Sequence, residues 1–344
     1  MKYFVSIIGL IAGLTSLGQS VNYLAPEQAV EILLGDGIVA TNITYAGSAV
    51  QIGEIAGFDG SGFPIGDGVI LSSADVVNVL PPGNFNEVPF GEGISGDADL
   101  LTVANSVPPL IGQFFSVGSV NDMSILEFDF TPTGDSLSFS YSFGSDEYLA
   151  WVNSSFNDVF AFFLSGPGIT GPYDSPPGFP DGAINIAFLP DSDPELPITI
   201  SSVNNVLNTE YYIDNPNNIG FAINGYTVTL QALAQVQCGE TYHIKLAIAD
   251  GSDTALESIV VLEAGSFSSN ALNIVGGVNN APEFLPGNTV LEGCVDGYFT
   301  IFYFNFISFD DVTIFTSFFN TCFYFHISKN LDSIYNSNRL ISFS

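Results

Sequence analysis

The most constraining feature of this sequence is an alternation of apolar and polar residues, with period two, that recurs along most of the chain. In residues 126–130 (LEFDF) the apolar side chains alternate with acids, and in residues 137–143 (LSFSYSF) they alternate with serine. Residues 226–230 (YTVTL) and 242–248 (YHIKLAI) continue the pattern. Because successive side chains of a strand point to opposite faces, each segment is predicted to be a strand with one buried and one solvated face.

Other segments narrow the fold class. Residues 159–164 (VFAFFL) are continuously apolar, which is typical of a strand buried on both faces. Turn sequences rich in Gly and Pro separate the strands, for example at residues 132–135, 166–168 and 176–178. One short helix is predicted over residues 25–35, with a proline near its start and a glycine at its end. These features together predict an all-β fold, an antiparallel, jelly-roll-like β-sandwich with one short N-terminal helix.

Residues 1–20 are predicted to be a secretory signal peptide. Lys2 supplies the positive charge, residues 4–17 are largely apolar, and small residues follow, with cleavage expected after Gly18 or Ser20. An uncleaved membrane anchor is the alternative, but the apolar run is shorter than the roughly 20 residues that a spanning helix needs. We therefore expect a protein that is secreted or lies on the outer cell surface, without membrane insertion after signal removal.

The charge balance limits the partners of the chain. It carries 36 acidic residues against 4 Lys and Arg, a net charge of -32. Without basic residues to neutralise phosphates, a nucleic-acid partner is excluded, and an anionic membrane surface is disfavoured. Most of the acids are expected to form a solvated surface that keeps an exported protein soluble. Where carboxylates crowd together, bound divalent cations or adaptation to a salty medium would offset their repulsion.

The composition changes abruptly at residue 297. All 35 Gly and all 19 Pro lie at or before this position, and residues 298–344 include 15 aromatic residues. We expect residues 298–344 to be an aberrant tail that is out of frame or disordered, because a native β domain needs turn residues. A transmembrane segment is the alternative, but Asp310 and Asp311 would lie near its centre.

Several sequence blocks between about residue 29 and residue 267 resemble the choice-of-anchor L domain, in the order that the family has them. The blocks are residues 66–73 (GDGVILSS), 96–100 (GDADL), 126–148 (LEFDFTPTGDSLSFSYSFGSDEY), 156–169 (FNDVFAFFLSGPGI), 236–250 (VQCGETYHIKLAIAD) and 262–267 (LEAGSF). The resemblance implies an exported module in surface proteins of gliding gram-negative bacteria, with no catalytic activity to carry over. Such proteins usually continue with immunoglobulin-like repeats and a C-terminal sorting domain, and the resemblance implies that residues 271–297 are the start of a second, immunoglobulin-like repeat. The sorting domain is missing here, which leaves the attachment of this chain open.

One combination of acidic residues is the candidate metal site. Asp146 and Glu147 follow one predicted strand and Asp158 precedes the next, so a shared calcium ion would tie together both ends of the loop 149–157. Calcium takes six to eight oxygen ligands, which carboxylates and loop carbonyls supply. Solvated loop acids are the alternative, because no EF-hand or nonapeptide calcium pattern occurs. Three further acidic pairs lie in predicted loops: Asp97 and Asp99, Asp191 and Asp193, and Asp250 and Asp253.

Trp151 and Tyr148 are the candidate ligand-binding residues. Trp151 is the only tryptophan, and Tyr148 lies close to it in the same acidic loop. Exposed rings beside carboxylates suit a sugar-binding platform, and packing of Trp151 into a small core of the loop is the alternative. Whether the ligand is a surface glycan or a protein is left open.

The sequence offers little for catalysis. His243 is expected to be exposed on the polar face of a strand beside Lys245, and there is no G-x-S-x-G nucleophile motif. Cys238 is expected to pair with Cys294 in a disulfide, with a free thiol as the alternative. We therefore expect that the protein is not an enzyme. We expect it to be a secreted or cell-surface module that acts in adhesion or surface assembly, with calcium as the candidate cofactor. The alternatives are a ligand-free structural spacer and a carbohydrate-active hydrolase that works through two carboxylates.

Overall fold

A computed structural model of the chain describes residues 18–35, 37–81, 90–91, 93–269, 273–277, 298–302 and 341–342. Most of the predicted signal peptide (1–20), of the predicted second repeat (271–297) and of the aromatic-rich tail (298–344) lies outside the described residues. The predictions made for these segments therefore stay predictions.

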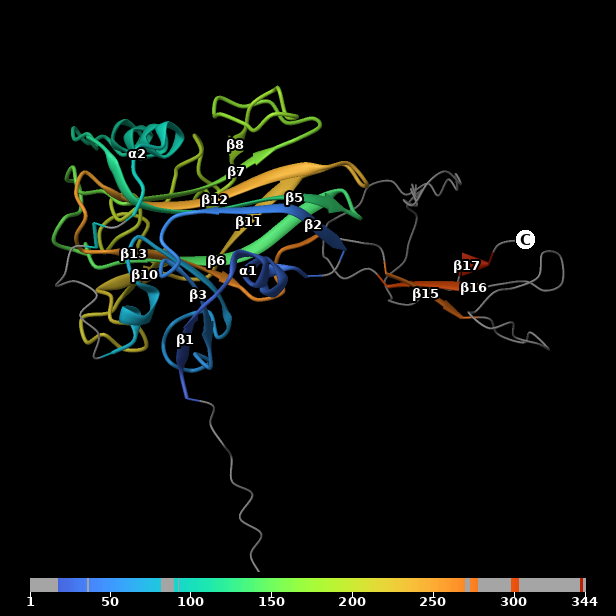
Figure 1. Ribbon diagram of the computed structural model, residues 1–344, viewed down its shortest axis with the longest axis horizontal. Coiled ribbons are helices and arrows are strands. Elements are labelled where there is room, and N and C mark those ends of the chain that lie inside the picture. The colour runs from blue at the N-terminus through green and yellow to red at the C-terminus, as the bar shows by residue number, and fades with distance from the viewer. Residues whose placement is uncertain are drawn as a thin grey trace, which may run out of the picture.

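Two antiparallel sheets face each other and form a β-sandwich, as predicted (Figure 1). The larger sheet has the order β1-β3-β4-β13-β6-β10-β9, and β11 and β14 also pair with β6. The smaller sheet has the order β2-β5-β12-β7-β8. The strands of the larger sheet are β1 (Ser20–Tyr23), β3 (Ile52–Ala56), β4 (Gly68–Ser72), β6 (Ser136–Ser145), β9 (Tyr212–Asp214), β10 (Gly225–Thr227), β11 (Leu230–Gln235), β13 (Ser258–Glu263) and β14 (Ser268–Ser269). Those of the smaller sheet are β2 (Ile38–Ala46), β5 (Val120–Pro132), β7 (Val159–Ser165), β8 (Ile184–Asn185) and β12 (Tyr242–Gly251).

Four helical segments and a separate small sheet complete the described elements. The helices are α1 (Pro26–Leu33) and α2 (Ala98–Leu110), and the 3-10 turns are η1 (Val76–Val79) and η2 (Thr209–Tyr211). The small sheet consists of β15 (Asn273–Gly277), β16 (Tyr298–Phe302) and β17 (Ile341–Ser342). No helix within the described ranges is long and apolar enough to cross a membrane.

The main hydrophobic core lies between the two large sheets. The alternation of β12 sends Ile244, Leu246 and Ile248 into this core, and Phe160 and Phe162 of β7 meet them there. The predicted helix α1 adds its buried apolar stripe to the same core. Full burial of one such aliphatic or aromatic side chain stabilises a fold by about 1.5–3 kcal/mol. The alternation read from the sequence therefore predicts correctly which strand faces are buried.

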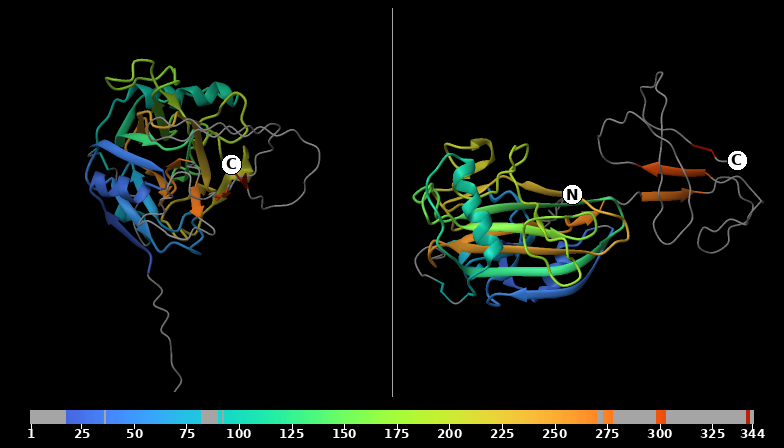
Figure 2. Two further views of the ribbon diagram at one scale, coloured as in Figure 1. Left: turned by 90° about the vertical axis from the view of Figure 1, so that its right-hand side faces the viewer. Right: turned by 90° about the horizontal axis from the view of Figure 1, so that it is seen from above.

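Helix α2 covers the outer face of the smaller sheet, and Figure 2 shows it lying across the strands. Phe163 of β7 and Ala247 of β12 are buried on this side. Strand β7 is thus buried on both faces, as its uninterrupted apolar sequence predicted. Helix α2 was not predicted, and the loop expected around Asp97 and Asp99 is in fact its beginning.

Candidate metal centre

Four strands bring acidic residues to one end of the sandwich. In the larger sheet, Asp146 directly follows β6 and Glu257 directly precedes β13, and these two strands are paired. In the smaller sheet, Asp158 directly precedes β7, and Asp250 lies near the end of the neighbouring strand β12. With Glu147, which follows Asp146 in the chain, these residues form what we call the carboxylate cluster.

The carboxylate cluster is removed from solvent. Glu147, Asp158, Asp250 and Glu257 are 0% exposed, and Asp146 is 2% exposed. Burying an ionised carboxylate costs several kcal/mol unless a positive charge and hydrogen bonds compensate it. The only lysine or arginine among the described residues, Lys245, pairs with Asp97 instead. The cluster must therefore take up protons or a cation.

Two carboxyl–carboxyl contacts hold the cluster together. The Asp158 N–H donates to Glu147 Oε2 at 3.4 Å, and the two carboxyl groups are close enough to share a proton. Asp250 and Glu257 form a second pair of this kind. Ser258 Oγ, on β13, donates to Asp158 Oδ2 at 2.6 Å. The cluster thus links the two sheets at this end of the sandwich.

Several polar atoms in this region accept or donate no hydrogen bond within the described part of the chain. They are both carboxyl oxygens of Asp146 and of Asp250, Oε1 of Glu147, and both ends of the buried Asn157 carboxamide. The Ser73 hydroxyl lies near Asp250 but donates to Glu257 Oε2 at 3.1 Å. More than 90% of buried polar groups in proteins are paired, and an unpaired one costs about 1–3 kcal/mol. A buried group of oxygens without donors has the chemistry of a hard-cation site.

Burial also changes the proton affinity of the cluster. Desolvation, with a smaller contribution from the charge of Asp158, raises the pKa of Asp146 to about 8. Desolvation, with a smaller contribution from the charges of neighbouring carboxylates, raises the pKa values of Glu147, Asp158, Asp250 and Glu257 as well. In the metal-free protein, part of the cluster is therefore protonated at neutral pH.

The described residues contain no three Asp, Glu, His or Cys side chains that already surround a common metal position. A cation could therefore bind only after some side chains rotate. Asp146 is the best suited to this, because it takes no part in the two carboxyl–carboxyl contacts and its carboxyl oxygens have no hydrogen-bond partner among the described residues.

The structure brings together the residues that the sequence assigned to a metal site. Glu147 and Asp158 are in contact across the loop 149–157, and Asp146 is close enough to Asp158 for their charges to interact. The sequence assignment missed Asp250 and Glu257. Asp250 could have been found, because the alternation of residues 242–248 continues inward to position 250. Glu257 lies in a loop and gives no such signal.

The two aromatic residues of the predicted sugar platform lie differently from each other. Tyr148 is 3% exposed and packs against Tyr212 with the ring centroids 4.8 Å apart, so the expectation of an exposed tyrosine ring was wrong. Trp151 is 39% exposed, and its other side packs edge-to-face on Phe156 at 5.0 Å. Trp151 therefore both anchors the loop and presents part of its ring to solvent.

Other predicted positions are also located by the structure. His243, expected to be exposed, is buried between Glu127 and Asp129 and forms hydrogen bonds with both. Asp191 is exposed, as solvated loop acids are expected to be. The pairing of Cys238 with Cys294 stays a prediction, since Cys294 lies outside the described residues.

The fold and the cluster together define the class of protein. It is an antiparallel β-sandwich with carboxylates buried at one end, where β6 and β12 end and β7 and β13 begin. The sequence profile of the Choice-of-anchor L domain matches residues 19–268. The chain belongs to this family, which confirms the resemblance seen in the sequence. The family is not a known enzyme family, and membership indicates a surface-associated module, secreted or anchored. Among curated proteins and among solved structures, none matches the chain significantly.

Proposed function

We propose that the protein is a non-catalytic adhesion module of a bacterial cell surface, and that its carboxylate cluster binds one calcium ion. Family membership supports the surface association. The proposed calcium ion rests on one observation. Five carboxylates are buried together without a basic partner among the described residues, and some of their oxygens accept no hydrogen bond there. A divalent cation would neutralise two of these charges and use the unpaired oxygens.

Calcium suits this cluster better than magnesium. Calcium accepts six to eight oxygen ligands in irregular geometry, whereas magnesium demands a near-ideal octahedron and keeps several waters. Asp146, Glu147, Asp158 and Asp250 would be the charged ligands. The buried carboxamide of Asn157 would add a neutral oxygen.

The position of the ion would couple it to the exposed surface. The loop 149–157 starts after Glu147–Tyr148 and ends at Asp158, and the Trp151 N–H donates to the Glu147 carbonyl at 3.0 Å. An ion held between Glu147 and Asp158 would therefore fix both ends of the loop that presents Trp151. Adhesion through this loop would then require calcium.

The fluorescence of Trp151, the only tryptophan of the chain, tests the calcium site directly. We expect calcium, titrated at constant ionic strength, to change the emission in a saturable way with one ion per chain. Glu147→Gln and Asp250→Asn should weaken the response strongly, and Asp191→Asn, in an exposed loop, should leave it unchanged. A response that sodium chloride reproduces, or that both cluster variants retain, would refute the site.

A cell-binding assay tests the adhesive role separately. We expect the purified protein to bind bacterial cell surfaces in calcium, and to bind less in chelator or with Trp151→Ala. If the wild-type protein and Trp151→Ala both fail to bind in calcium, the adhesive function is wrong and a ligand-free spacer is favoured.

A further inference from the structure

A second site lies on the outer face of the smaller sheet, where a pocket of about 170 Å³ opens beside the start of α2. It is lined by Asp99, Glu127, Phe163, Ser165, Asp174, Ser175, Pro176, Ala183, His243 and Lys245. Lys245 and Asp250 are five residues apart on β12, about 17 Å at the usual rise of a strand. The alternation of β12 also points them to opposite faces of the sheet. The pocket is therefore separate from the carboxylate cluster.

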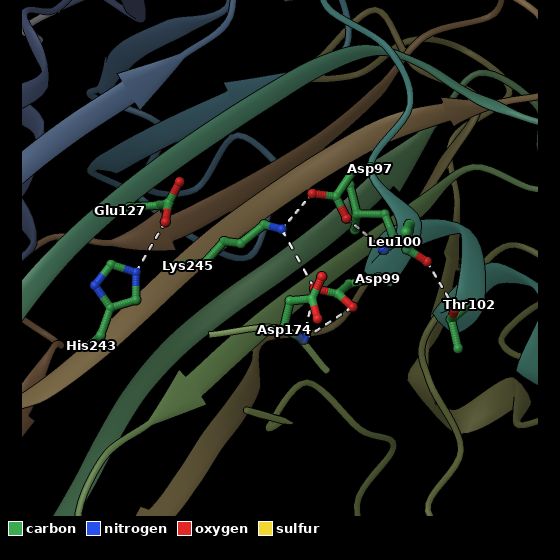
Figure 3. Close-up of polar contacts among 9 residues, drawn as sticks. Asp97, Asp99, Leu100, Thr102, Glu127, Asp174, His243 and Lys245 are labelled. Atoms are coloured by element: carbon green, nitrogen blue, oxygen red, sulfur yellow. Dashed lines mark hydrogen bonds and ion pairs between the residues drawn. The ribbon is translucent and has the colours of Figure 1, made fainter. Parts of the chain in front are cut away.

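Carboxylates hold both basic side chains of the pocket in place. His243 Nδ1 lies 2.8 Å from Asp129 Oδ1, and its Nε2 lies 3.0 Å from Glu127 Oε2. Lys245 Nζ forms an ion pair with Asp97 and lies 3.9 Å from Asp99 (Figure 3). It also lies 5.1 Å from the centre of the Phe163 ring. The lysine and the histidine are thus fixed by the protein itself.

One hydroxyl group of the pocket has no hydrogen-bond partner in the part of the chain that the structure describes. Ser165 is 1% exposed, lines the pocket, and its Oγ makes no hydrogen bond to any described residue. A buried hydroxyl is normally paired, so Ser165 indicates a ligand with its own hydrogen-bonding groups. Phe163 and Ala183 lie beside it and are buried, and the Phe163 ring packs against Tyr173 with the ring centroids 4.9 Å apart.

The charged side chains around the pocket indicate the charge of the ligand that it can bind. Five carboxylates, those of Asp97, Asp99, Glu127, Asp129 and Asp174, surround one lysine and one histidine, so an anionic ligand is disfavoured. Asp174 is exposed and lies beside Asp99, where its N–H donates to the Asp99 carboxylate (Figure 3). A pocket of this volume has room for at least one small ring.

We propose that this pocket binds one amino-sugar ring. Asp174 and Asp99 would bind its ammonium group, and Ser165 and Glu127 would bind its hydroxyls. This site goes beyond the calcium site and does not rest on it, because none of its lining residues belongs to the carboxylate cluster.

Isothermal titration with three sugars of the same ring tests the proposal: glucosamine, glucose and glucuronate, at a pH where glucosamine is charged. We expect glucosamine to bind most tightly, glucose more weakly and glucuronate not at all. Ser165→Ala and Asp174→Asn should each weaken glucosamine binding about five- to tenfold, the effect of losing one hydrogen bond. Asp191→Asn should not change it. A β-linked glucosamine trisaccharide distinguishes two sources of the bound ring. If the trisaccharide binds as well as glucosamine, the ligand is the end of a glycan; if it does not bind, the ligand is the free sugar.

The titration is carried out in chelator as well as in calcium. Equal glucosamine binding in both confirms that the pocket is independent of the calcium site. Glucuronate binding as tightly as glucosamine, no binding of any of the three sugars, or unchanged affinity in both variants would overturn the proposal. Asp174 is exposed, so its variant is expected to fold even if Ser165→Ala does not.

Discussion

The buried carboxyl group of Asp146 shows, at the scale of one residue, how desolvation determines what the cluster can bind. Its pKa is raised from 3.8 to about 8, so a proton is held more tightly in the folded than in the unfolded chain. Such a group stabilises the fold below its unfolded-state pKa, and this contribution is lost as pH rises through the folded-state pKa. Without calcium, the protein should therefore lose stability between about pH 4 and pH 8.

Removal of this one charge should stabilise the metal-free protein. In chelator at pH 8, we expect Asp146→Asn to raise the free energy of unfolding by about 1–3 kcal/mol, because a buried, unpaired charge disappears. At pH 5 the gain should be smaller, since Asp146 is then already protonated. In calcium the order should reverse, because the variant lacks a ligand. Urea unfolding measures all three values, and a variant that is less stable than wild type in chelator at pH 8 would contradict the account.

His243 should give a pH dependence of its own. Burial lowers its pKa, but the hydrogen bonds to and charges of Glu127 and Asp129 outweigh burial and raise the pKa above 6.5. Its contribution is therefore fully present below about pH 6.5 and is lost as pH rises through the folded-state value. We expect His243→Gln to cost more stability at pH 5.5 than at pH 8.5, measured as the difference from wild type. An equal cost at both values would mean that His243 is not charged in the fold.

The residue scale also shows where sequence reasoning stops. Alternation correctly predicted which side chains of β12 face the core, and the same alternation would have placed Asp250 there. It also predicted that His243 lies on the outer face of the sheet, which is correct, and that its side chain is exposed there, which is wrong. The side chains of Glu127 and Asp129 and the ring of Phe179, which approach His243 only in the folded chain, cover it. The burial of Tyr148 likewise depends on Tyr212, which is far away in the sequence.

At the scale of elements, α2 is the main feature that the sequence reading missed. Its buried residues Leu100, Val103, Ala104 and Val107 have helical spacing, but the glycines before it favoured a loop. The helix begins at Asp97, whose Oδ1 accepts a hydrogen bond from the Leu100 N–H at 2.9 Å. The same carboxylate pairs with Lys245 of β12 and so fastens the helix to the sheet.

Two substitutions at Asp97 separate these contributions. Asp97→Ala removes both the cap and the ion pair, and it should lower the free energy of unfolding by about 1–2 kcal/mol or more. Asp97→Asn keeps a capping oxygen and removes only the charge, so it should cost less. Chemical unfolding of the two variants measures the difference. Equal costs would show that the cap contributes nothing.

At the scale of the whole molecule, the carboxylate cluster lies where both sheets end and contains residues of each. Asp146 and Glu257 come from the larger sheet, and Asp158 and Asp250 from the smaller. The sandwich itself was predictable, because its periodicity is local. The cluster was predictable only in part, because the residues that complete it are about a hundred positions apart in the sequence. A calcium ion bound there would cross-link the two sheets.

Thermal unfolding of the protein in millimolar calcium and in chelator tests this central claim most directly. One specific site at a hundredfold its Kd adds about 2.7 kcal/mol, which raises the Tm of a domain of this size by about 5 to 10 °C. We predict such a shift for the wild-type protein, no comparable shift with sodium chloride of matched ionic strength, and a largely lost shift in Asp250→Asn. A Tm that calcium raises no more than sodium chloride does, or raises equally in wild type and Asp250→Asn, would contradict the calcium site.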